Sequence, residues 1–292
     1  MQPRKSRPTK CESKATTSFS TFPPDGCQVP ELPEVETITR ALDPRLRGRR
    51  ILSAEFRCRR VLRGDPDQTA ADLAGRKVRE VRRHGKFIEI VLDGGHSFVV
   101  HLGMTGKLLL NSLPGRHTHA ILTLDRGTLV YEDSRQFGRL ELSEGLPPRV
   151  SKLGPEPLEV TLDQLSALLK ARKSRMKSLL LNQRFLRGIG NIYADEALFR
   201  AGIHPLAAAA RLRLERVKRL HDAIRKVLRA AIAAGGSSIS DYVDVDGRQG
   251  SFQVSHNVYQ RTGEPCPKCG TPIRRILVAQ RATHFCPKCQ KK

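Results

Sequence analysis

The spacing of apolar residues predicts a helix near residue 33, after a stretch with no apolar period. We expect the helix to begin at Pro33, a residue that suits the first helical turn, and to end before Gly48. Its apolar positions are Val35, Ile38, Leu42 and Leu46, which recur at helical spacing. One face of this helix should therefore lie against a core.

Short β-type segments replace the helical period after this helix. Between residues 51 and 132 they read ILSAEFR, KVREVRR, KFIEIVL, SFVVHLGM, HAILTL and TLVYE. Gly, Asp-Gly and Pro-Gly separate them, which is the pattern of strands joined by tight turns. We expect an antiparallel β-sandwich or barrel.

The helical period returns in the second half of the chain. Helices are expected over residues 161–171, 174–183, 191–201 and 211–234, and short strands follow from about residue 250. The predicted fold class is α+β with several domains. These are an antiparallel β-sandwich with flanking helices at 30–148, a Pro- and Gly-rich hinge at 149–157, a helical domain at 158–252 and a β-hairpin module at 253–292.

Residues 1–29 carry no periodic apolar pattern. They are rich in Pro, Ser, Thr and Lys, so we expect a disordered leader. They lack the apolar core of a signal peptide, and no clear amphipathic helix marks an organelle transit peptide. We favour a start codon that was assigned too early, because Val29 is what an internal GTG codon encodes.

Composition favours a nucleic-acid partner. The chain has 52 Lys and Arg against 29 Asp and Glu, a net charge of +23 and a pI near 10.4. Such an excess attracts polyanions and gains from counterion release. A ribosome-associated protein and a generic high-pI protein are the alternatives. No apolar run approaches the roughly 20 residues that span a bilayer, so we expect no membrane partner.

Two CPKC motifs predict a metal site. They comprise Cys266 and Cys269, then Cys286 and Cys289, with 16 residues between the two motifs. Each CxxC turn presents two thiolates to one metal, and a hairpin between the pairs completes a tetrahedral four-cysteine zinc site. The rival interpretation, a redox CxxC, expects one pair near a βαβ unit. With seven cysteines in all, an odd number, a secreted disulfide framework is disfavoured and a reducing cytosol is expected.

Several motifs carry a resemblance to a known family. In order they are PELPEVE, HLGMTGKL, DSRQFG, LGPEPL, GIGNIYADEALFRAGIHP and CPKC…AQRATHFCPKC. Together they resemble the formamidopyrimidine-DNA glycosylase family of base-excision repair, from Pro30 to Lys292. The resemblance implies a β-sandwich, a helix-two-turn-helix domain and a zinc finger. It also implies a monomer in the bacterial cytosol that acts on oxidised purines in double-stranded DNA.

The chemistry of such an enzyme requires an amine nucleophile. An α-amine has a pKa near 7.7–8.0, well below the 10.4 of lysine, so more of it is unprotonated at neutral pH. By resemblance, Pro30 attacks the sugar C1′ and forms a Schiff base, Glu31 is the acid, and Glu34 holds the amine and sugar. Alone, Pro30 could simply shape the turn, and glutamates in a first helical turn commonly complement the helix dipole.

Further residues match DNA-contacting positions of the family. The resemblance assigns Lys86 and Arg281 to phosphates near the lesion and to elimination, with Gln280 and Arg281 near the tip of the zinc hairpin. Asn191 is expected to cap a helix whose N–H groups hold a phosphate. His117 and Arg172 match backbone-contacting positions. Each could otherwise be an ordinary surface or capping residue.

Base extrusion leaves a gap in the duplex that the protein must fill. By resemblance, Met104, Arg135 and Phe137 enter this gap, with Phe137 as the apolar wedge and Arg135 facing the orphaned cytosine. Gln136 departs from the arginine that is common there. The Gly- and Ser-rich segment 235–252 suits a mobile loop over the flipped base, or a linker.

Three other functions remain as alternatives. A retained leader would block the Pro30 amine and leave a non-catalytic DNA-binding relative. An enzyme of the endonuclease VIII branch would prefer pyrimidine lesions, although PELPEVE points to the purine branch. A zinc-ribbon ribosomal protein fits the charge but leaves the Pro-Glu-Glu helix unexplained.

Overall fold

Helix α1 (Leu32–Leu46) follows directly from the apolar period of its sequence. The computed structural model describes residues 29–239 and 242–292, so the predicted leader, apart from Val29, lies outside the described residues. Pro33 occupies the first turn of α1, as expected. The predicted apolar positions Val35, Ile38, Leu42 and Leu46 are all buried. This face of α1 packs onto the sheet that contains β3 (Val78–His84).

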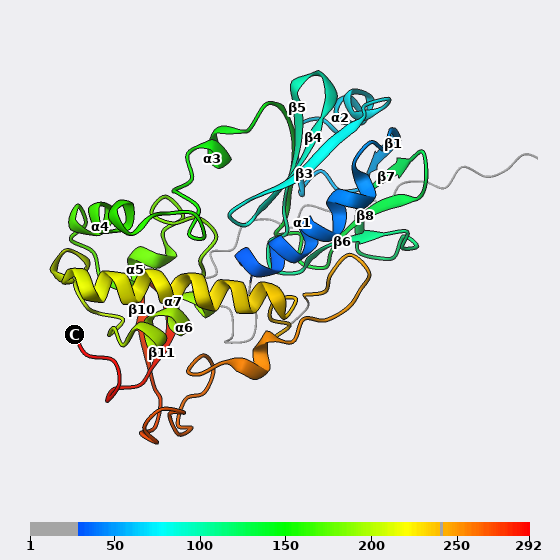
Figure 1. Cartoon of the computed structure of the whole chain (residues 1–292). Coiled ribbons are helices and arrows are strands. Elements are labelled where there is room, and N and C mark those ends of the chain that lie inside the picture. The colour runs from blue at the N-terminus through cyan, green and yellow to red at the C-terminus, as the bar shows by residue number, and fades with distance from the viewer. Residues whose placement is uncertain (1–28, 240–241) are drawn as a thin grey trace, which may run out of the picture.

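Two sheets form the β domain (Figure 1). One sheet has the order β1 (Ile51–Phe56), β7 (Thr118–Leu124), β8 (Thr128–Asp133), β6 (Gly106–Leu110). The other has the order β2 (Leu62–Arg63), β9 (Arg139–Glu144), β5 (His96–His101), β4 (Phe87–Leu92), β3. Neighbouring strands are antiparallel except β2 and β9, which are parallel. The expectation of an antiparallel sandwich is confirmed.

The inner faces of the two sheets share one apolar core. Phe56 on β1 and Phe98 on β5 have their ring centroids 6.3 Å apart, and buried residues of both sheets belong to the same cluster. Helix α2 (Pro66–Leu73) and the short helix η1 (Asp93–Gly95) complete the domain. The sequence analysis missed α2, β2, β6 and β9.

The helical domain contains α3 (Pro148–Ser151), α4 (Leu162–Lys170), α5 (Met176–Leu181), α6 (Asn191–Ala201), η2 (Ala209–Arg211) and α7 (Leu214–Ala233). The four predicted helices are confirmed, with ends trimmed by up to three residues. Its core is separate from that of the β domain. Among the described residues, no helix has the length and apolar character to cross a bilayer.

Charged and apolar contacts join the two domains across the predicted hinge. Arg83 on β3 forms an ion pair with Glu156 at 2.9 Å, and Glu156 also pairs with Arg187 at 3.1 Å. Beyond α7, the chain returns to the β domain, where Tyr242 and Val245 are buried in the sheet core. It then passes through η3 (Phe252–Ser255) to the zinc module.

The zinc module is a hairpin of β10 (Arg274–Val278) and β11 (Arg281–Phe285). The two residues of its turn, Ala279 and Gln280, both have positive φ, as a two-residue hairpin turn requires. The predicted position of Gln280 and Arg281 at the tip is confirmed. Strand β11 lies beside α6 (Figure 1).

Candidate active site

Glu31 connects the first helix of the β domain to the start of α6. Pro30 and Glu31 are both buried just before α1. The Glu31 carboxylate accepts hydrogen bonds from Gly190 N at 2.7 Å and Ile192 N at 3.1 Å. These N–H groups are otherwise unpaired at a helix start, and the helix dipole favours a negative charge there. The arrangement holds the carboxylate beside Pro30.

Glu34 is a buried carboxyl that titrates near neutral pH. Burial, followed by the charge of Glu31, raises its pKa to about 7. Its oxygens accept hydrogen bonds from the Tyr193 hydroxyl at 2.5 Å, Ser237 N at 2.8 Å and Glu31 N at 2.8 Å, which act in the opposite direction. Glu34 therefore positions the backbone of Glu31.

Lys86 lies in the turn between β3 and β4, and its amine is close to Gly190 and Glu31. A Cβ added at Gly190 would overlap both the Glu31 carboxyl carbon and Lys86 Nζ. Only glycine therefore allows the carboxylate and the amine to approach α6 so closely. Burial lowers the pKa of Lys86, the neighbouring charge of Arg281 also lowers it, and Glu31 opposes the shift.

The expectation that Asn191 caps α6 is wrong. Gly190 occupies the N-cap position and Asn191 is the first helical residue. The Asn191 amide instead donates to Ala282 O of β11 at 3.0 Å. The physical reason is that Glu31, from another helix, already accepts the free N–H groups of this helix start.

A buried charge network, which the sequence analysis missed, holds α5, α6 and the zinc hairpin together. Lys177 Nζ lies 2.7 Å from Asp195 Oδ1, and both side chains are fully buried. Lys177 also donates to Asn191 O at 2.8 Å, and Asp195 Oδ2 accepts from His284 N at 2.8 Å. The only hint in the sequence is an aspartate inside an apolar helix. The network orients the strand that carries Arg281.

The three predicted gap-filling residues lie on two adjacent loops. Met104 is half-buried in the turn between β5 and β6, and Arg135 and Phe137 are exposed between β8 and β9. The Arg135 guanidinium carbon lies 4.7 Å from the Phe137 ring centroid, and Phe137 is 43% exposed. A Cβ at Gly103 would lie 2.5 Å from Gly138 N, so the two loops are in close contact.

Asp133 ties these loops together and was also missed from the sequence. It is fully buried, and its Oδ1 accepts from the Thr105 hydroxyl and from Arg135 N at 3.2 Å. Its Oδ2 accepts from Gly138 N at 2.7 Å and the Tyr131 hydroxyl at 3.1 Å. One carboxylate thus sets the backbone on both sides of Arg135 and Phe137.

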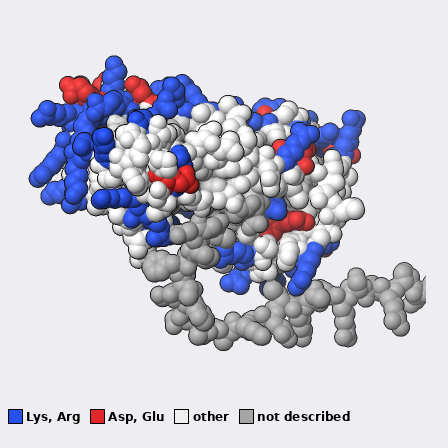
Figure 2. All heavy atoms as spheres, turned by 90° about the horizontal axis from the view of Figure 1, so that it is seen from below, with Lys and Arg blue, Asp and Glu red and all other residues white. Residues whose placement is uncertain are grey.

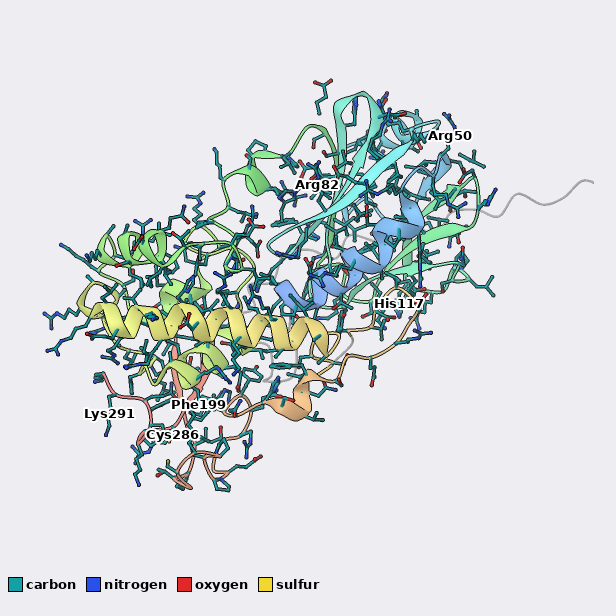
Figure 3. All side chains as sticks on the ribbon, viewed as in Figure 1. Arg50, Arg82, His117, Phe199, Cys286 and Lys291 are labelled. Carbon is teal, nitrogen blue, oxygen red and sulfur yellow. The ribbon has the colours of Figure 1, made fainter. Side chains whose placement is uncertain are left out.

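The remaining predicted DNA-contacting residues lie on the surface. Arg281 is exposed at the hairpin tip. His117 is exposed in the loop between β6 and β7 (Figure 3), and Arg172 is exposed just after α4. The structure brings Glu31 and Lys86 together at Gly190, with Pro30 next to Glu31 in the chain and Glu34 bonded to the Glu31 backbone. His117 and Arg172 lie outside this group.

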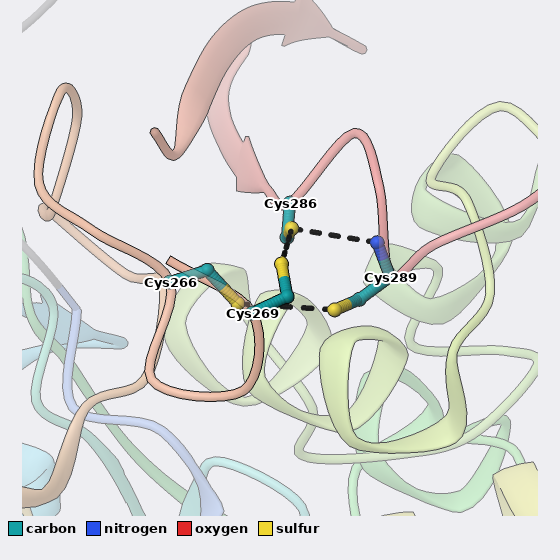
Figure 4. A group of neighbouring side chains, drawn as sticks. All are labelled: Cys266, Cys269, Cys286 and Cys289. Carbon is teal, nitrogen blue, oxygen red and sulfur yellow. Dashed lines mark hydrogen bonds between the residues drawn. The ribbon is translucent and has the colours of Figure 1, made fainter. Parts of the chain in front are cut away.

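The four predicted cysteines form the zinc site (Figure 4). Cys266 and Cys289 have their Sγ atoms 3.9 Å apart, Cys269 and Cys286 have theirs 3.6 Å apart, and all four lie within 4.8 Å of one another. Zn–S bonds of about 2.3 Å in a tetrahedron place sulfurs about 3.8 Å apart. The donor set therefore fits one zinc ion with a closed, structural coordination shell.

Three family models match the chain in order. The formamidopyrimidine-DNA glycosylase N-terminal domain matches residues 29–140, the formamidopyrimidine-DNA glycosylase H2TH domain matches 153–243, and the zinc finger found in FPG and IleRS matches 263–292. The order agrees with the three units of the fold.

Individual relatives give the same result. A formamidopyrimidine-DNA glycosylase of Solibacter usitatus is 64% identical over 265 residues, covering 90% of this chain and all of the relative. One from Chloroflexus aurantiacus is 46% identical over 271 residues, covering 90% of this chain and 98% of the relative.

Solved structures agree as well. The crystal structure of the MutM (Fpg) protein from Thermus thermophilus is 45% identical, with a TM-score of 0.82, and the match covers 89% of this chain and 98% of that one. The Lactococcus lactis Fpg in complex with a Fapy-dG-containing DNA is 36% identical, with a TM-score of 0.82, and the match covers 90% of this chain and all of that one.

Proposed function

The chain belongs to the formamidopyrimidine-DNA glycosylase family of base-excision repair, and we propose that it is a bifunctional enzyme of this family. It removes oxidised purines, such as 8-oxoguanine and formamidopyrimidines, from double-stranded DNA and then cleaves the abasic site by β,δ-elimination. The observation that carries the proposal is the convergence of Glu31 and Lys86 on Gly190, beside Pro30.

Pro30 is the nucleophile in this proposal. Its secondary amine attacks the sugar C1′, and the C1′–base bond breaks as the base leaves with that electron pair. The nitrogen then loses its proton, and its lone pair expels the ring oxygen O4′ to form a cationic iminium, which can accept the electrons released by elimination. An amide nitrogen has no usable lone pair, so the reaction requires removal of every residue before Pro30.

Glu31 carries the proton in this reaction. Two N–H donors hold its carboxylate beside Pro30, where it takes the proton that the Pro30 nitrogen loses and delivers it to the sugar O4′ as the ring opens. Glu34 positions Glu31 through its backbone N–H. Lys86, with its lowered pKa, assists elimination and binds the neighbouring phosphate.

Surface residues hold the extruded substrate. Arg281, His117, Arg172 and the start of α6 at Asn191 face the DNA backbone in this proposal. Met104, Arg135 and Phe137 fill the gap left by the base. Support for Phe137 is its exposure, which is unusual for a large apolar side chain. Segment 235–252 covers the lesion, although residues 240–241 lie outside the described residues.

Borohydride trapping on 8-oxoguanine duplexes tests the nucleophile. Two forms of the protein are compared, one that begins at Pro30 and one that retains Met1. We expect a covalent protein–DNA adduct only with the first form, because only a free amine gives a reducible imine. Equal trapping by both forms would assign the nucleophile to another amine, and absence of trapping with either form would overturn the Schiff-base mechanism.

Lesion preference is tested separately. Excision of 8-oxoguanine should be faster than excision of thymine glycol by about tenfold or more, equivalent to ~1.4 kcal/mol in the barrier. The opposite order would place the enzyme with the pyrimidine-preferring branch.

A further inference from the structure

A basic depression lies at the end of α6 that is remote from Gly190. It is formed by the end of α6, the start of α7 and the zinc module, and its basic residues are Arg200, Arg216, Arg219, Lys268 and Lys291. Helix α6 has 11 residues, so the depression begins about 16 Å along the helix from the candidate active site. It is therefore a separate place on the molecule.

Among the described residues, the basic side chains of this depression have one anionic partner, the C-terminal carboxylate of Lys292, which accepts a hydrogen bond from Arg216. The other lining residues are Ala201, Gly202 and Cys289. Within residues 29–239 and 242–292, no Asp or Glu side chain forms an ion pair with any of the five basic residues. Elsewhere, arginines such as Arg45 and Arg83 pair with carboxylates. The depression thus keeps an excess of positive charge.

Two of these side chains are held in place by the protein itself. The Arg216 guanidinium donates to Lys291 O at 2.7 Å and Lys292 O at 3.1 Å. Lys268 Nζ lies 4.8 Å from the Phe199 ring centroid. Burial and the adjacent charge of Arg219 lower the pKa of Arg216. An anion bound here would relieve that repulsion with little loss of side-chain freedom.

The basic surface continues along α7. A second depression is lined by Arg225, Lys226 and Arg229 with a single acid, Asp222. Arg216 and Arg229 are separated by about 20 Å along α7 at 1.5 Å per residue. Figure 2 shows Lys and Arg side chains gathered at the end of the molecule that carries the start of α7.

We propose that this surface, from Arg200 and Lys291 to Arg229, binds the phosphodiester backbone of a second segment of DNA while the active site holds the first. A long stripe of positive charge matches an extended polyanion, because each phosphate contact releases a counterion. Neither depression is lined by a large apolar or aromatic side chain, which a protein partner would need for a stable interface. The inference goes beyond the proposed excision chemistry and concerns how the protein moves between DNA segments.

A triple variant tests the surface. Arg200→Gln, Arg219→Gln and Lys291→Gln remove three exposed side-chain charges and leave the backbone contacts of Lys291 in place. The matched control is Arg60→Gln, Lys77→Gln and Arg79→Gln, which removes the same charge from exposed positions of the β domain. Both variants should excise 8-oxoguanine from a short duplex at the wild-type rate.

Binding of undamaged DNA gives the first readout. For the test variant, the slope of log K against log salt should become shallower by about 2 to 3, since each phosphate contact contributes about 0.9. The control variant should keep a slope close to that of the wild type. An equal loss in both variants would mean that only net charge matters, and would overturn the proposal.

The number of duplexes bound per protein gives the second readout. It shows whether the phosphates on this surface come from a second duplex or from the same duplex. With duplexes of about 12 base pairs, roughly 40 Å long, the wild-type protein should bind one lesion duplex and one undamaged duplex. The test variant should bind only the lesion duplex. A wild-type stoichiometry of one would overturn the second-segment proposal, and a salt effect seen only with long DNA would then assign the surface to the same duplex. Neither readout requires excision, so failure here is distinct from failure of the proposed function.

Discussion

The carboxylate of Glu31 accepts a hydrogen bond from Gly190 N at 2.7 Å, although the two residues are 159 positions apart. This contact joins the start of the β domain to the helix that begins the second half of the helical domain. The Glu31 carboxylate and the start of α6 therefore come into contact only when both domains are assembled.

Replacement of Gly190 by alanine should separate Glu31 and Lys86. Gly190 has φ of −131°, which alanine also adopts, so the effect is steric and arises from the overlap of Cβ with both side chains. A displacement of about 1 Å commonly lowers rates by about 100-fold. We expect this loss in single-turnover excision of 8-oxoguanine, while DNA binding is largely retained.

Gly115→Ala is the matched control for this change. Gly115 has no positive φ, and its nearest neighbour would lie 3.4 Å from the added Cβ. If Gly190→Ala keeps the wild-type rate, the close approach of Glu31 and Lys86 is not needed for excision.

Glu34 should make the folded protein less stable as pH rises from about 4.5 to about 7. Its pKa is higher in the folded protein than in the unfolded chain, so the folded state binds the proton more tightly and loses this advantage above pH 7. The loss amounts to roughly 3 kcal/mol in the free energy of unfolding. Glu34→Gln should lack this loss.

The measurement is urea unfolding of both proteins between pH 4 and 8. His101 and His256 act in the opposite direction, because burial lowers the pKa of each to about 4. Their contribution is common to both proteins and cancels in the difference. A difference that does not vary with pH would show that Glu34 has the same pKa in the folded and unfolded states, and would contradict the prediction.

Asp133→Asn should disturb the two loops that carry Met104, Arg135 and Phe137. An amide NH2 at this position would face the Tyr131 hydroxyl and Gly138 N–H, whose hydrogen bonds the carboxylate now accepts. A buried donor left without an acceptor costs about 1–3 kcal/mol. We expect this loss of stability together with weaker discrimination between cytosine and adenine opposite 8-oxoguanine. Cleavage of a preformed abasic site should change less.

Asp125→Asn is the control for this variant, because Asp125 is exposed at the turn between β7 and β8. Opposite-base discrimination equal to that of the wild type in Asp133→Asn would mean that the loops do not depend on this carboxylate.

Zinc removal should release the hairpin that carries Arg281. The cysteine cluster holds the ends of β10 and β11, and structural zinc contributes about 10–16 kcal/mol in isolated fingers. Cys286→Ser should lower the zinc content and the affinity for DNA together. Cys58→Ala, which alters a buried thiol of the β domain, should retain one zinc per chain. Full DNA affinity in zinc-free protein would contradict this role.

The sequence by itself determined the longer helices, six strands of the β domain and their order. The apolar period of α1 and of the later helices indicates which face of each helix is buried, and the two CPKC motifs specify a metal by spacing alone. These features are local, because the spacing of a few residues decides them. The motif resemblance added Pro30, Glu31 and Lys86 as candidate site residues.

Only the tertiary structure decided the partners of the buried polar groups. Nothing near Asp133 or Asp195 in the sequence indicates that one joins two loops and the other pairs with Lys177. Asn191 shows the limit most clearly, since its local sequence predicts a cap that Glu31 replaces from a distant helix. The apolar period of a sequence reveals that a side chain is buried, but the partner of a buried polar side chain depends on which elements pack together.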